Sequence, residues 1–389
     1  MTSTGFIYCI IKWFEFFVLF FCGKTLETTK TRKDYWRIAI IPIIVFALVE
    51  GLRWGRLIDW NNGVVEFEEL DSFVNERNLS NPLYTIVLYP LKCLGFSYPF
   101  FVFLQCGFLM FSALFLLQDY KKYLCWILPC LIMAFINNEN FIRFYFSLSF
   151  LLIAIYYYLH SCTKRFILFA VLTVLTHFAQ IPFLIILLCS KYLNKKQFPR
   201  MVGIVFFLVG IFLIDISRMN FLVRISDFIL SSLGLESEYR LFSVLGNMED
   251  IINGTAHGTE GRLFVKSITY KISNAMLYVP LLWLAPSCLK KEQYGNLIYN
   301  LTVLNVVLTP VLGQAELLNR FTLSFNIFVV ISLAAVIVNN IKKNTAIIVY
   351  MMLFIYFYAF LNAPFVREDY MMYFLWDSDG AATNYAPYY

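Results

Sequence analysis

The feature that most constrains this chain is a series of apolar stretches, most of them separated by short clusters of Lys and Arg. Several stretches are shorter than the ~20 residues of an upright span, which implies local thinning of the bilayer or burial among neighbouring helices. Because only helices and closed barrels satisfy their backbone hydrogen bonds in lipid, we predict an all-α polytopic integral membrane protein. The ten expected spans lie near residues 5–22, 36–51, 98–117, 123–136, 141–159, 201–216, 272–289, 296–312, 321–339 and 345–362.

Composition excludes a water-soluble protein. Of the 389 residues 60% are hydrophobic, only 14% are charged, and the mean hydropathy is +0.69. A soluble domain of this length does not tolerate that much apolar surface. No linker rich in Pro or Ser divides the chain, so residues 1–389 are interpreted as one membrane domain whose partner is the lipid bilayer. The net charge of +6 comes mainly from short loops and indicates orientation, not nucleic-acid binding.

The basic clusters predict how the chain is threaded, since such clusters collect on the cytoplasmic side. The apolar stretch 166–190 has a basic cluster at each end. A single span would place those ends on opposite sides, so we predict a hairpin or re-entrant pair that turns at Thr176-His177-Phe178. This threading puts the N-terminus outside. It also gives a first outer loop at 53–95, which includes an interfacial helix, and a long outer loop at 217–271.

With this threading, lysine and arginine are sorted to opposite faces. Thirteen of the 17 lysines are cytoplasmic, whereas 10 of the 14 arginines are outside. Arginine presents a planar, permanently charged fork suited to phosphate or pyrophosphate. Four of the outer arginines belong to the long loop 217–271, and four others lie at span boundaries: Arg53, Arg56, Arg143 and Arg320. We interpret these four as candidate ligands of an anionic substrate.

Several short motifs occur in a characteristic order. Gly51-Leu52-Arg53-Trp54-Gly55 ends an apolar stretch and Asp59 follows it. Asn140-Phe141-Ile142-Arg143 starts another stretch, and His177 lies centrally in the apolar segment that ends at Leu188. Tyr385-Ala386-Pro387-Tyr388 lies directly before the last residue, Tyr389. Together they resemble the EpsG family of Wzy-like polysaccharide polymerases over nearly the full length. The chain departs from the family pattern at Gly63, where a tyrosine is common, and at Phe144, where a glutamine is common.

The resemblance implies a GT-C-like or Wzy-like membrane architecture and a metal-independent glycosyltransferase of the bacterial cytoplasmic (inner) membrane. The implied reaction joins glycan repeat units linked to polyprenyl pyrophosphate, on the outer face. The implied partners are the lipid-linked oligosaccharide and, in the same pathway, a chain-length regulator and a flippase.

Each candidate role has a structural alternative. Arg143, with Asn140 beside it, is expected to bind pyrophosphate or glycan, although an arginine at a span start also snorkels. Asp59 is a candidate general base, or an ion-pair partner of Arg53 or Arg56. His177 is a candidate base or a packing residue. The acidic residues Glu66, Glu68, Glu69 and Asp71 are interpreted as a solvated loop face.

Cysteine and histidine do not indicate a metal site. The nine cysteines lie in or near apolar stretches without a CxxC pair, and the three histidines lack neighbours at metal-ligand spacing. We therefore expect neither a metal nor another cofactor.

Other classes of function remain open. An O-antigen ligase differs mainly in its acceptor, and a polysaccharide acyltransferase is also close in chemistry. A flippase would have charged residues distributed through its spans and pseudo-repeated halves, neither of which is evident. A purely structural membrane subunit is a further alternative.

Overall fold

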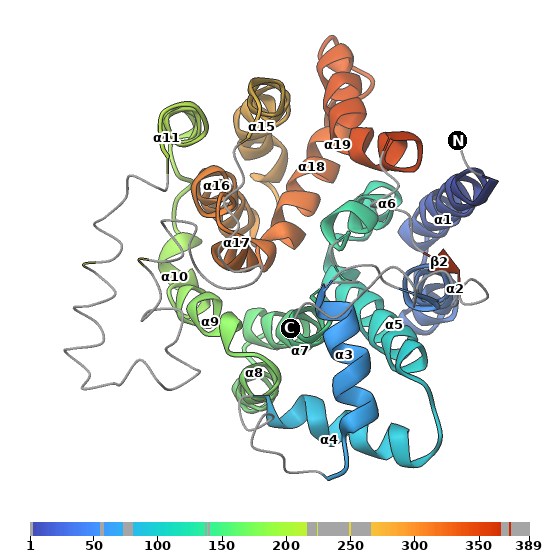
Figure 1. Ribbon diagram of the computed structural model, residues 1–389. Coiled ribbons are helices and arrows are strands. Elements are labelled where there is room, and N and C mark those ends of the chain that lie inside the picture. Colours follow the sequence, from blue (N-terminus) through green and yellow to red (C-terminus); the bar gives the residue numbers. More distant parts are fainter. Residues whose placement is uncertain are drawn as a thin grey trace. The chain divides into compact units, whose positions relative to one another are not determined.

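The computed structural model describes residues 3–54, 58–72, 81–136, 138, 141–215, 224, 249, 266–366 and 373–374. The chain divides into two compact units, one of residues 1–180 with 356–389 and one of residues 181–355. Figure 1 shows the helices of both units. Apart from one pair of two-residue strands, the regular structure in these described ranges is helical, as predicted.

The first unit contains the segments that carry most of the sequence motifs. Its strands pair antiparallel, with Arg53 opposite Phe374. Its elements are α1 (Ser3–Glu27), α2 (Arg32–Gly51), β1 (Arg53–Trp54), α3 (Ile58–Glu69), α4 (Pro82–Cys93), α5 (Tyr98–Leu117), the 3-10 turn η2 (Gln118–Tyr123), α6 (Leu124–Ala134), α7 (Ile142–Leu159), α8 (Thr163–Thr176), the 3-10 turn η3 (Phe178–Gln180) and β2 (Tyr373–Phe374).

Helix α5 is the central helix of this unit because it packs against both α2 and α7. Helix α1 packs on α2 and α6, and α8 packs on α7. The contact between α2 and α5 is close. A Cβ added to Gly51 would lie 2.4 Å from the Cα of Phe103. Small residues permit such approach between membrane helices, so this glycine is required for the packing of α2 on α5.

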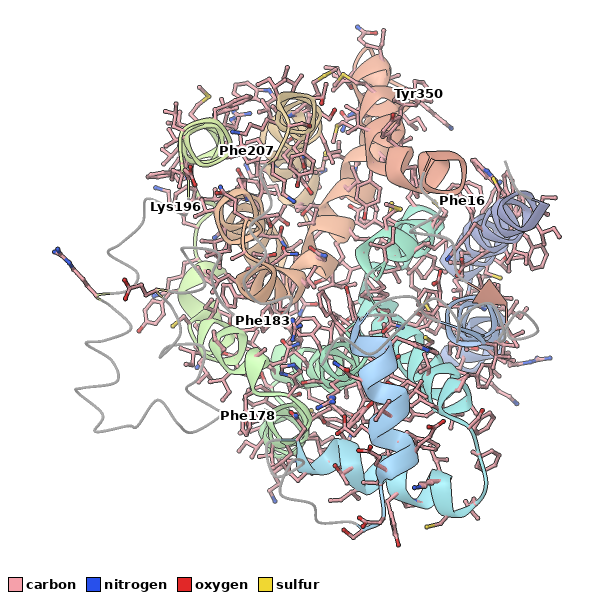
Figure 2. All side chains as sticks on the ribbon, viewed as in Figure 1. Phe16, Phe178, Phe183, Lys196, Phe207 and Tyr350 are labelled. Atoms are coloured by element: carbon pink, nitrogen blue, oxygen red, sulfur yellow. The ribbon has the colours of Figure 1, made fainter. Side chains whose placement is uncertain are left out.

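The second unit is a group of helices in which α16 and α18 both pack against α15. Phe183, labelled in Figure 2, contacts two other aromatic rings, with its ring centroid 4.6 Å from that of Phe325 and 6.1 Å from that of Phe328. The helices are α9 (Ile181–Leu188), α10 (Ser190–Leu193), α11 (Arg200–Phe212), α15 (Ile268–Leu289), α16 (Gly295–Leu312), α17 (Glu316–Leu323), α18 (Asn326–Asn340) and the first part of α19 (Ala346–Val366).

Membrane spans are supported in part. By length and composition, four helical segments of the described residues qualify, namely 98–134, 142–159, 268–289 and 295–312. Shorter apolar helices cover 178–188, 200–212, 326–340 and 346–358. Within 98–134 the helix is interrupted at Tyr120, which has non-helical backbone angles. The interruption agrees with the predicted boundary between two spans, whereas the total of ten spans stays a prediction.

The expected span 321–339 coincides with α18 from Asn326 onward, whereas its first residues belong to α17, which ends at Leu323. The Asn305 side-chain amide of α16 donates to the carbonyl oxygen of Thr322 at 2.8 Å and to Oδ1 of Asn326 at 3.1 Å. These contacts stabilise polar groups on both sides of the break, and hydropathy alone does not report them.

The predicted turn at Thr176-His177-Phe178 coincides with a helix end. Helix α8 stops at Thr176, and His177 has extended backbone angles of −164° and 120°. Because α9 belongs to the second unit, the hairpin itself stays a prediction. The long outer loop expected at 217–271 lies almost entirely outside the described residues.

Candidate active site at the start of α7

The acidic segment after Asp59, expected to be a solvated loop face, forms the helix α3 as far as Glu69. Its acidic residues are exposed as expected except Glu66, which is partly buried. One face of the helix is buried, and it carries Trp60, Gly63 and Phe67 at positions i, i+3 and i+7. This spacing is the helical signal, and it was obscured by Asn61-Asn62-Gly63, which are poor helix formers. Tertiary packing therefore outweighs local propensity in this segment.

Two contacts hold α3 against the helix that follows it. The Lys92 ammonium of α4 donates to the carbonyl oxygen of Glu68 at 2.5 Å and to that of Leu70 at 2.7 Å. It thereby satisfies carbonyls that the helix end leaves without a partner. Helix α4 in turn ends in a Schellman motif. In this motif Gly95 has φ +78°, and the Phe96 N–H donates to Leu91 O at 3.0 Å.

Arg143 lies in the first turn of α7 and is held by two other helices. Its guanidinium forms an ion pair with the Glu66 carboxylate of α3. Its Cζ lies 5.1 Å from the ring centroid of Tyr84 in α4. The Arg143 side chain is 28% exposed and that of Glu66 is 20% exposed. An arginine in this turn adds to the positive end of the helix, so the position favours an anion.

Two tyrosines lie behind this pair. The hydroxyl oxygens of Tyr84 and Tyr98 are 3.3 Å apart. Burial raises the pKa of Tyr84 to about 12, and the nearby Arg143 cation opposes that rise. The Tyr84 hydroxyl is therefore a proton donor at neutral pH. A Cβ on Gly63 would lie 2.1 Å from the Tyr98 hydroxyl oxygen, so a larger residue at this position would require Tyr98 to shift.

His177 lies near the same end of α7. Its ring meets that of Phe144 edge to face, with centroids 6.0 Å apart, and Phe144 directly follows Arg143. Its Nδ1 is 3.2 Å from the Ala179 backbone N–H. A neutral ring that accepts at Nδ1 carries its proton on Nε2, so in this arrangement Nε2 donates. The geometry thus suits a hydrogen-bond donor better than a base.

The turn before α7 contains a buried amide. Asn138 is fully buried, and its backbone N–H donates to Phe135 O at 2.8 Å. Its side chain accepts from Gln105 Nε2 at 3.1 Å and donates to Cys106 Sγ at 2.9 Å, both in α5. The start of α7 is thereby fixed to the central helix.

The other predicted site residues fall in different places. Arg53 lies in β1 and Asp59 in the first turn of α3, both described here by their backbone. Arg56 and Asn140 lie outside the described residues. Arg320 is half-buried in α17 of the second unit. The structure thus brings Arg143 and His177 to one helix end and adds Glu66, Tyr84 and Tyr98, whereas convergence with Arg320 stays a prediction.

Within the described part of the chain, no three His, Cys, Asp or Glu side chains are grouped so that they would hold a metal ion. Arg143 places a partly exposed cationic side chain at this site, and such a side chain can meet a negatively charged group.

The model of the EpsG family matches residues 36–376, which is most of the chain. The chain belongs to the EpsG family. The matched range contains the motifs around Arg53, Arg143 and His177, so the resemblance drawn from these residues is confirmed. The terminal Tyr385-Ala386-Pro387-Tyr388 lies beyond it. No match was found among curated proteins or among solved structures.

Proposed function

We propose that this EpsG-family chain is a Wzy-like polymerase that joins glycan repeat units carried on polyprenyl pyrophosphate. The reaction would take place on the outer face of the bacterial cytoplasmic membrane. Family membership and the apolar helices support a membrane enzyme of polysaccharide synthesis. The observation that carries the proposal is Arg143, which is partly exposed at a helix N-terminus and oriented by Glu66 and Tyr84.

In the proposed reaction, an acceptor hydroxyl oxygen bonds to the anomeric carbon of the donor while the bond from that carbon to the pyrophosphate oxygen breaks. The leaving group departs as polyprenyl pyrophosphate and its negative charge grows. A preorganised guanidinium stabilises such charge best where water is partly excluded. Arg143 would provide this stabilisation without a metal ion, and Arg53, Arg56, Arg320 and Asn140 would bind further phosphate or glycan groups.

The acceptor proton needs a base. We predicted His177 or Asp59 from the sequence, and the Nδ1 contact of His177 favours donation from this ring. A carboxylate of α3 is the better acceptor of the proton. Glu66 is engaged in the ion pair with Arg143, and an opposite charge makes a carboxylate a weaker base. We therefore assign the base to Asp59 and a donor role toward glycan or phosphate oxygen to His177.

Replacement of Arg143 tests the proposal. Arg143→Ala is expected to lower polymerisation of a lipid-linked repeat roughly a hundredfold and to leave short chains on gels. Arg143→Lys keeps the positive charge but loses the planar guanidinium fork, so it is expected to retain only part of the wild-type polymerisation activity.

The matched control is Arg165, whose Cζ also lies over a tyrosine ring, 5.3 Å from the centroid of Tyr157. It lies just after α7, at the end opposite to Arg143. Arg165→Ala is expected to leave chain length unchanged. Long chains at normal protein levels in Arg143→Ala would overturn the proposal.

A further inference from the structure

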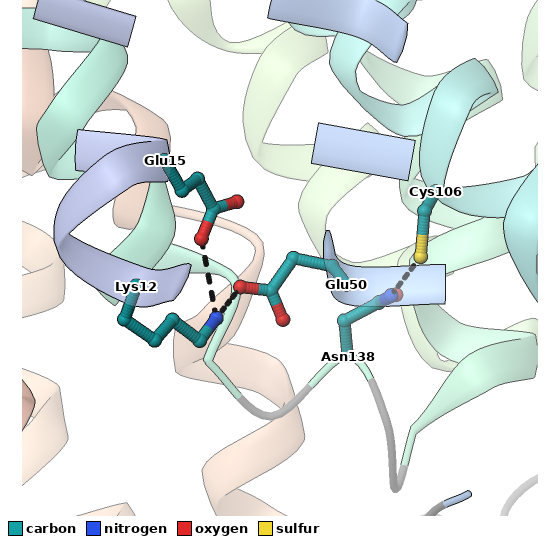
Figure 3. Close-up of polar contacts among 5 residues, drawn as sticks. All are labelled: Lys12, Glu15, Glu50, Cys106 and Asn138. Atoms are coloured by element: carbon teal, nitrogen blue, oxygen red, sulfur yellow. Dashed lines mark hydrogen bonds and ion pairs between the residues drawn. The ribbon is translucent and has the colours of Figure 1, made fainter. Parts of the chain in front are cut away.

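A buried ionic cluster lies inside the first unit, in helices expected to span the membrane. Lys12 and Glu15 belong to α1 and Glu50 to α2, and these residues are 6%, 0% and 5% exposed. The Lys12 ammonium lies 3.3 Å from Glu15 Oε2 and pairs directly with Glu50 Oε1 (Figure 3). Ionisable groups at such positions are expensive to bury and generally serve a specific purpose.

The cluster holds the end of α2. Glu50 and Gly51 are the last two residues of this helix. Glu50 is fixed to α1 by Lys12, and Gly51 lies against the backbone of Phe103 in α5. Two neighbouring helices therefore determine where α2 stops. The chain leaves this point through Leu52 directly into β1, which begins at Arg53.

The same region of α5 also holds the start of α7. Gln105 and Cys106, just after Phe103, contact the Asn138 side chain in the turn that leads to Arg143. Figure 3 shows the contact of Asn138 with Cys106 in one view with the ionic cluster. Thus the end of α2 and the start of α7 are both fixed on one segment of α5, and each is followed by a proposed pyrophosphate ligand.

We propose that Lys12 and Glu50, with Glu15, are positioning residues that hold Arg53 in register with the substrate site. This inference rests on the proposed function. The cluster is not explained by stability alone, because well-packed neutral side chains of similar volume often replace a buried ion pair without loss. Neutral side chains would, however, remove the ion pair that fixes the end of α2 to α1.

The experiment compares the wild type with the neutral variant Lys12→Met/Glu15→Gln/Glu50→Gln in purified, full-length protein. The variant is expected to remain folded and to keep kcat within a few-fold, while KM for the lipid-linked donor rises roughly tenfold or more. Amide hydrogen exchange at residues 52–54 is expected to become faster. The charge-swapped variant Lys12→Glu/Glu50→Lys is expected to restore part of the affinity.

The control is Glu27→Gln, near the other end of α1, where the Glu27 carboxylate accepts from the Cys125 backbone N–H at 3.1 Å. It is expected to leave KM and exchange at residues 52–54 unchanged. A purely structural cluster would lower the amount of active enzyme without changing KM, and that result would overturn the inference. If the wild type does not polymerise, the proposed function fails, whereas exchange at 52–54 still supports or refutes the anchoring of α2.

Discussion

Arg143 is oriented by side chains of two other helices. Its guanidinium forms an ion pair with Glu66 and lies over the ring of Tyr84. Both side chains of the ion pair remain partly exposed, so the pair alone stabilises the fold little. Its effect is expected to be orientation of the guanidinium.

Glu66→Gln is expected to lower kcat/KM for the lipid-linked donor because Arg143 loses its charged partner. In the double variant Glu66→Gln/Arg143→Ala, the decrease in kcat/KM is expected to be smaller than the two single decreases combined. The coupling free energy between the two residues is expected to be on the order of 1 kcal/mol. Steady-state rates of all four proteins measure this coupling. Glu68→Gln, an exposed neighbour on the same helix, serves as control. Fully additive losses would show that Glu66 acts independently of Arg143.

At this scale the sequence identified Arg143 as a residue at a span boundary, and His177 through a predicted turn and the family resemblance. The structure places both residues at one end of α7. Glu66 was missed because it lies among other acidic residues, and only the spacing of Trp60, Gly63 and Phe67 distinguishes that segment from a loop. Its partner is 77 residues away, a separation that local patterns do not report.

At the scale of elements, the contact between α2 and α5 contains two glycines with different surroundings. A Cβ on Gly51 would meet the Phe103 backbone at 2.4 Å, whereas one on Gly107 would lie 3.5 Å from the Ala47 Cβ, an ordinary contact. Backbone atoms cannot move aside as a flexible side chain can. The two positions are therefore expected to respond in opposite ways to the same substitution.

Gly51→Ala is expected to lower the free energy of unfolding by about 1–3 kcal/mol because the helices must separate. Gly107→Ala is expected to be neutral or to raise it by roughly 0.5–1 kcal/mol, since alanine is the better helix former. Thermal unfolding in detergent measures both. Equal stability of the two variants would contradict the close approach.

Helix boundaries were largely predictable from sequence, because apolar runs and basic clusters identify them. The break between α17 and α18 was not predictable from sequence, because it depends on Asn305, which lies in another helix. Hydrogen bonds of side-chain amides between helices cannot be recognised from the hydropathy of the sequence. The same reason explains why the anchoring of the α7 start by Asn138 and Gln105 was not foreseen.

At the scale of the whole molecule, threading through the membrane depends on the segment around His177. Helix α8 ends there, and the turn that would return the chain to the cytoplasm stays a prediction. If instead the segment crossed once, every later loop would change sides.

A reporter fused after Lys195 is expected to be cytoplasmic, because the basic clusters at both ends of 166–190 then obey the positive-inside rule. Activity of paired reporters, one active inside and one outside, measures the side. A fusion after Lys122 precedes the disputed segment and is expected to be cytoplasmic in either threading. An external signal after Lys195 would exclude the hairpin.

Helix α18 has a consequence for how the protein is made. Its 15 residues extend about 22 Å at the helical rise, less than the hydrocarbon thickness of about 30 Å. Twelve of its residues are buried, and α15 and α16, both synthesised earlier, pack against it. Such a segment offers the translocon little lipid-facing surface. We therefore expect its integration during synthesis to depend on helices that have already left the ribosome.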